Sequence, residues 1–132
     1  PPINVQLEIH ETPQEKGIQD PLLAVFPHRD AGRAVLFLLH PSGRIQRLGV
    51  EREADPSLLD RFLAAAAEKD EPFPTAEIYG AEVSPLALRW LRKNSHRLTF
   101  FRYHDFPGRG DVVRAVGGAL AQGQFAERNI FL

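Results

Sequence analysis

Apolar and polar residues alternate at the start of the chain, over residues 3–9. This period of two predicts a strand with one buried face. Continuous apolar runs follow at 22–26 and 34–39, and a further apolar segment spans 45–50. Strands that are covered on both faces have such runs. The Pro, Gly and Asp residues between the segments are typical of turns, so the first half of the chain is predicted to be an antiparallel meander.

A helix is predicted to begin at Asp55–Pro56. Aspartate is a favoured N-cap, and proline suits the first position of a helix because its missing N–H has no partner there. A single apolar stripe with helical spacing follows, and it should pack on the sheet. The residues of this stripe are Leu58, Leu59, Phe62, Leu63 and Ala66.

Two further helices are predicted in the second half of the chain. Ser84–Pro85 repeats the start signal, and Asp111 is a candidate cap for a helix that runs to about Ala121. Short strands are predicted at 75–79 and 98–103. The predicted buried face of the second helix consists of Leu86, Ala87, Trp90 and Leu91.

These elements predict one α+β domain over residues 1–132. Its mixed β-sheet consists of the N-terminal antiparallel meander followed by β-α-β-α crossover units, with about three helices packed on it. The composition, 43% hydrophobic and 25% charged, is that of a globular protein.

Several classes of chemistry are excluded or disfavoured by the residues present. The chain has no cysteine, which excludes disulfides and thiolate sites and favours a cytoplasmic location. No apolar run approaches the ~20 residues that span a bilayer. The five histidines have no metal-binding spacing, and we predict neither a metal nor a cofactor. Glu77 and Glu82 are a candidate acid–base pair only by proximity in sequence, so no catalytic residue is predicted.

Residues 45–104, with the order strand, helix, strand, helix, strand, resemble the second half of the GCN5-related N-acetyltransferases. Ala81 to Ser84, Trp90–Leu91 and the aromatic strand after Arg97 stand at comparable places. The resemblance implies an acetyltransferase-like topology. The family's glycine-rich pyrophosphate loop would fall at 53–57, where this chain has no glycine and two acidic residues.

Charge is distributed unevenly along the chain. Residues 1–82 contain 8 Lys+Arg and 14 Asp+Glu, whereas residues 83–132 contain 8 and 3. The basic half is also rich in aromatic residues, and arginine with aromatics is typical of nucleic-acid-binding surfaces. An alternative is that the aromatics form the core and the arginines pair with the acidic half. The candidate anion-binding residues are Arg89, Arg92, Lys93, Arg97, Arg102 and Arg109.

The C-terminal tail carries large apolar residues, which is unusual for a chain end. We predict that it docks, either on its own sheet or across the interface of a two-fold homodimer. Its candidate interface residues are Phe125, Ile130, Phe131 and Leu132.

The predicted function is that of a non-enzymatic binding or interaction module. Its basic C-terminal half would engage an anionic partner such as nucleic acid. Two alternatives stay open: an acetyltransferase-like protein that has no coenzyme A loop, and a self-associating structural protein.

Overall fold

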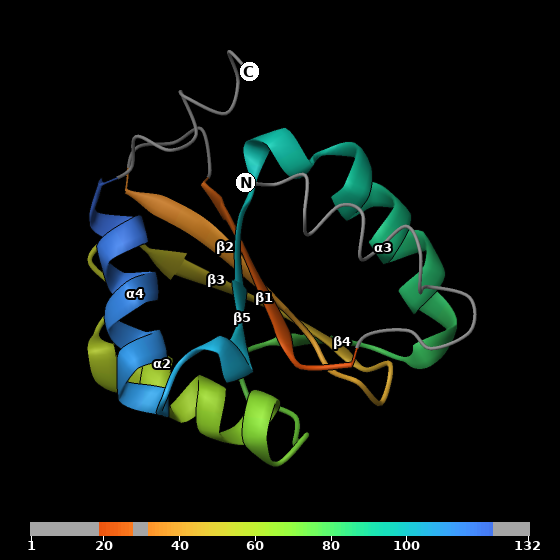
Figure 1. Ribbon diagram of the computed structural model, residues 1–132, viewed down its shortest axis with the longest axis horizontal. Coiled ribbons are helices and arrows are strands. Elements are labelled where there is room, and N and C mark those ends of the chain that lie inside the picture. The colour runs from red at the N-terminus through yellow and green to blue at the C-terminus, as the bar shows by residue number, and fades with distance from the viewer. Residues whose placement is uncertain (1–18, 28–31, 123–132) are drawn as a thin grey trace.

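The computed structural model describes residues 19–27 and 32–122, which form a five-stranded sheet with helices on both faces (Figure 1). The α+β class and the antiparallel meander are confirmed, and the strand predicted at 3–9 lies outside the described residues. The strands are β1 (Leu22–Pro27), β2 (Arg33–Leu39), β3 (Ile45–Glu51), β4 (Glu77–Tyr79) and β5 (Thr99–Arg102). The helices are α2 (Pro56–Leu63), α3 (Ser84–Lys93) and α4 (Arg109–Gln122).

The sheet has the strand order β4-β3-β2-β1-β5, and each of these neighbouring pairs is antiparallel. This differs from the mixed sheet that we predicted. The helix α3 carries the chain from β4 at one edge of the sheet to β5 at the other edge. Because every neighbouring pair in the sheet is antiparallel, β4 and β5 point the same way, as the two strands of a crossover unit do. The strands β3, β2 and β1 lie between them.

The register assigns the strand side chains to two faces, because successive residues of a strand point to opposite sides. One face packs against α2 and α4, and the other face packs against α3 (Figure 1). The first face presents Leu23, Val25, Leu36, Leu38, Leu48 and Val50. The second presents Leu22, Ala24, Leu39 and Ile45.

The helix α2 begins as predicted, with Asp55 as its N-cap. The Asp55 carboxylate accepts hydrogen bonds from the backbone N–H of Ser57 at 3.0 Å and from its hydroxyl at 3.2 Å. The helix continues as a π turn over Ala64–Glu68. Lys69 is its C-cap, and the next residue, Asp70, has a φ of 54° in the left-handed region, which turns the chain out of the helix.

The helix α3 is rotated relative to our prediction. Leu88 and Leu91 are buried against the sheet, whereas Leu86 is 61% exposed and Trp90 is 41% exposed. The Ser84 hydroxyl does not cap the helix but donates to the Gly43 carbonyl at 2.6 Å. This bond ties the start of α3 to the β2–β3 turn, where Gly43 has a φ of 98°.

The helix α4 begins earlier than predicted, because its first residue is Arg109 and the predicted cap, Asp111, comes after it. The Gly108 carbonyl accepts from the N–H groups of Asp111 and Val112, at 3.1 and 3.4 Å. Asp111 therefore lies in the first turn instead of at the cap, and its carboxylate contacts the Arg114 guanidinium. The helix packs beside α2, so the two form one layer under the sheet.

Candidate anion-binding surface

Five of the six predicted anion-binding residues gather in the α3 layer. Arg89, Arg92 and Lys93 lie on α3 itself, and Arg97 follows in the 3₁₀ turn that leads to β5. Arg102, the fifth, lies opposite Leu22 in the ladder between β1 and β5, so its side chain leaves the sheet on the α3 face.

The outer face of α3 combines cations with exposed apolar side chains. Leu86, Arg89, Trp90 and Lys93 have the spacing i, i+3, i+4, i+7, which places them in one stripe. All four are exposed. Among the described residues, neither Arg89 nor Lys93 has a carboxylate at ion-pair distance.

An aromatic cluster supports Trp90 from the sheet side. Its ring lies 5.8 Å from the ring of Phe26 in an edge-to-face arrangement, and 6.0 Å from the ring of Phe37. The Arg97 guanidinium lies over the Phe26 ring at 5.1 Å from its centroid, a cation–π distance. We call the set of Leu86, Arg89, Trp90, Lys93, Phe26, Phe37 and Arg97 the α3 surface.

Acidic residues are absent from the sequence between positions 83 and 104, the stretch that supplies α3 and β5. In contrast, residues 55–71 contain five Asp+Glu and two Lys+Arg, and they form α2, its π turn and the following loop. The charge asymmetry of the sequence therefore becomes an asymmetry between the two helical layers.

Arg109, the sixth predicted residue, lies in the opposite layer. Its Nε donates to Asp60 Oδ1 at 2.8 Å, and its Nη1 donates to Glu68 Oε1 at 2.6 Å. The bond to Asp60 raises the pKa of Arg109. The other Glu68 oxygen accepts from the Tyr103 hydroxyl. Burial, together with this bond to Glu68, raises the pKa of Tyr103 above its ordinary range. The arginine thus joins α4 to α2 through two carboxylates.

A second polar cluster lies at the β2–β3 turn. His40 Nδ1 lies 3.1 Å from the Ser42 hydroxyl oxygen and 3.6 Å from Asp70 Oδ2. Arg44 Nη1 donates to the Asp70 carbonyl at 2.6 Å. Both His40 contacts fall on the same ring nitrogen, so the imidazole does not relay a proton from the serine to the carboxylate.

The carboxylates singled out in the sequence are not brought together as an acid–base pair. Glu77 accepts from Arg47 at 3.0 Å and from the Tyr79 hydroxyl at 3.0 Å, and the latter bond raises the pKa of Tyr79. Glu82 lies in the 3₁₀ turn before α3, and its carboxylate lies beside Gly80. Within residues 19–27 and 32–122, no group of three or more potential metal ligands is positioned to hold an ion.

The turn that the acetyltransferase resemblance would assign to pyrophosphate binding leads into α2. The Asp55 carboxylate occupies the N-terminus of this helix and takes up the Ser57 N–H. A negative charge at this position repels a phosphate group from the N–H donors that would otherwise bind it.

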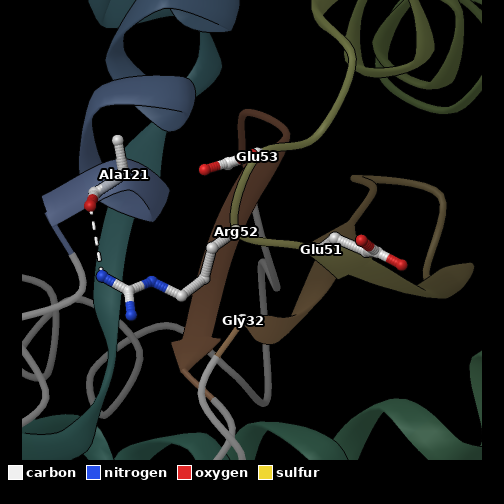
Figure 2. Close-up of a pocket in the computed structure, with 5 residues that line it drawn as sticks. All are labelled: Gly32, Glu51, Arg52, Glu53 and Ala121. Carbon is white, nitrogen blue, oxygen red and sulfur yellow. Dashed lines mark hydrogen bonds between the residues drawn. The ribbon is translucent and has the colours of Figure 1, made fainter.

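An open pocket of about 420 Å³ lies where β3 ends (Figure 2). The Arg52 guanidinium points to the C-terminal end of α4 and donates to the carbonyls of Leu120 at 3.3 Å and Ala121 at 3.2 Å. A cation at a helix C-terminus stabilises the helix, which accounts for Arg52. The residues that line the pocket are Gly32, Glu51, Arg52, Glu53 and Ala121.

Sequence reasoning identified the basic and aromatic residues of the second half but missed Phe26 and Phe37, which lie in strands of the first half. Their apolar runs showed only that the strands are buried.

The predicted interface residues Phe125, Ile130, Phe131 and Leu132 lie outside the described residues. No described helix has the length and apolar character needed to cross a bilayer.

Comparison with known proteins identifies no relative: no family model, no curated protein and no solved structure matches this chain.

Proposed function

We propose that the protein is a nucleic-acid-binding module and that the α3 surface is its binding site. The observation that carries the proposal is the stripe in which Arg89 and Lys93 flank the exposed Trp90 ring. Cations contact phosphates, and an aromatic ring offers a flat apolar surface to a base.

The surroundings of the stripe favour a polyanion. No acidic residue lies between positions 83 and 104, so no carboxylate from this stretch competes for the cations. The side chains of Arg89 and Lys93, one helical turn apart, have Cβ atoms about 6 Å from each other. Both are exposed, and little desolvation is needed for them to contact phosphates.

Salt-dependent binding tests the proposal. The affinity for labelled oligonucleotides would be measured from about 50 mM salt upward. Each lost phosphate contact reduces the steepness of log K against log salt by about 0.7 to 0.9. We expect the double variant Arg89→Ala/Lys93→Ala to flatten this slope by about one to two units.

The matched control removes the same charges from the opposite layer. Lys69 and Arg114 are exposed on the α2–α4 side, and Lys69→Ala/Arg114→Ala should bind as the unaltered protein does. Equal losses of affinity in both double variants would show that only the net charge of the protein matters, and this would contradict the proposed site. Absence of binding at about 50 mM salt would refute the function. If Arg89→Ala/Lys93→Ala instead lowered the mass of the protein in solution, the function would be self-association through the charged layers and not nucleic-acid binding.

A further inference from the structure

The side chain of Trp90 is held so that part of its ring stays in solvent. It is 41% exposed, although its edge-to-face contact with Phe26 and its contact with Phe37 fix it from below. Aromatic pairs of this geometry are favourable beyond the area they bury. A ring that is already fixed loses little freedom when a flat partner covers its exposed part.

We propose that the α3 surface selects single-stranded nucleic acid, an inference that rests on the proposed function. An unpaired base stacks on the Trp90 indole, and the flanking phosphates contact Arg89 and Lys93. Stacking on an aromatic side chain requires a base whose face is free, and the bases of a duplex cover each other's faces.

The outer face of α3 is poorly suited to reading a duplex. A helix that enters the major groove needs side chains that hydrogen-bond to base edges. In the exposed stripe of α3, Arg89 and Lys93 could contact base edges, but the large apolar side chains of Leu86 and Trp90 occupy the rest of the stripe and suit stacking better. The Arg97 guanidinium, which lies over the Phe26 ring, adds a further positive charge to the α3 surface.

Trp90 is the only tryptophan of the chain, so its fluorescence reports the proposed contact directly. The probe is a mixed-sequence 12-nucleotide strand, compared with the same sequence as a duplex and with inorganic polyphosphate as a polyanion without bases. We expect the single strand to quench the emission and to bind more tightly than the duplex. Polyphosphate should compete with the strand at low salt without quenching to the same extent. Unchanged emission on saturation with the single strand, or tighter binding of the duplex, would overturn the inference.

Variants separate stacking from charge. Trp90→Ala should lower the affinity for the single strand about ten- to a hundredfold, and Trp90→Phe should retain most of it. Ile78→Ala, which removes another exposed apolar side chain (40% exposed) from β4, is the matched control and should have no effect.

The outcomes distinguish the inference from the function on which it rests. If Trp90→Ala binds the single strand normally while Arg89→Ala/Lys93→Ala binds weakly, stacking is refuted and the binding surface stands. If both variants bind normally, both proposals fail. Should circular dichroism show that Trp90→Ala is unfolded, Trp90→Phe and the quenching of the unaltered protein decide the question.

Discussion

The side chain of Gln46 on β3 is hydrogen-bonded to the backbone N–H of Phe73, which donates to its Oε1 at 2.9 Å. The Nε2 of the same amide donates to the Glu71 carbonyl at 2.8 Å. Gln46 is only 1% exposed. Its bond with Phe73 is buried, and its bond with the Glu71 carbonyl is partly buried. One buried amide thus satisfies both a donor and an acceptor of the loop that leads from α2 to β4.

Replacing this amide should be costly. Gln46→Leu leaves the buried Phe73 N–H and the partly buried Glu71 carbonyl without their partner. An unsatisfied buried group costs about 1–3 kcal/mol. We expect urea unfolding to show a loss of about 2–4 kcal/mol. Arg47→Leu, at the neighbouring position with a half-exposed ion pair to Glu77, should cost less than about 1 kcal/mol. Similar losses in both variants would show that the amide does not hold the loop.

The core under the sheet should be sensitive to truncation of Phe62. This side chain is fully buried, and its ring meets the ring of Phe73 edge-to-face at 5.5 Å. Phe62→Ala should lower the free energy of unfolding by about 3–5 kcal/mol because it leaves a cavity. Leu86→Ala, which truncates an apolar residue that is 61% exposed, should stay within about 0.5 kcal/mol. If Phe62→Ala did not change the midpoint of urea unfolding, the assignment of Phe62 to the core would be wrong.

Tyr103 should make stability depend on alkaline pH. Its pKa in the folded protein is raised by burial and by the bond to Glu68, whereas in the unfolded chain it is near the ordinary value of about 10. The stabilisation is therefore fully present below pH 10 and is lost as pH rises above it, because the unfolded state releases the proton first.

Unfolding in urea at about pH 8 and pH 11 measures this effect. Tyr103→Phe should lose less stability between these two pH values than the unaltered protein. Tyr79→Phe, which removes the only other tyrosine, should change the pH dependence less because Tyr79 is less buried. An identical pH dependence in Tyr103→Phe and the unaltered protein would refute the assignment.

Arg109 and Arg89 should have opposite roles. Arg109 is paired with Asp60 and Glu68 across the α2–α4 contact, whereas Arg89 is exposed on α3. We expect Arg109→Ala to lower the melting temperature, because Asp60 and Glu68 lose their shared partner, and to leave nucleic-acid affinity unchanged. Arg89→Ala should lower the affinity and leave stability unchanged. Thermal melting and oligonucleotide titration of both variants give the comparison, and weaker binding by Arg109→Ala would extend the site to the α2–α4 layer.

Local signals in the sequence were sufficient where a single residue and its neighbours determine the structure. Asp55–Pro56 predicted the start of α2 correctly because a cap and the helical φ of proline act over a few residues. The meander was predicted for the same reason, from apolar runs and the turns between them.

Features that depend on distant partners were not accessible in this way. The helix α3 has two stripes with helical spacing, one with Leu88 and Leu91 and one with Leu86 and Trp90. Which stripe is buried depends on the shape of the sheet surface that Leu22 and Leu39 provide. The position of β5 beside β1 likewise depends on where α3 crosses the sheet, and an apolar strand has the same pattern in parallel and antiparallel pairs. The candidate cations were identified from the sequence, but only the fold separates Arg109 from the other five.

The π turn of α2 also bears on how the chain could vary in length. A π turn holds one residue more than an α turn, and its first four residues, 64–67, are all alanine. The run is thus one alanine longer than a regular helix would need between the same end points. Deleting one alanine should return the segment to regular α-helix without moving Glu68 away from Arg109. This helix can therefore absorb the deletion of one residue while the contacts between α2 and α4 stay in place.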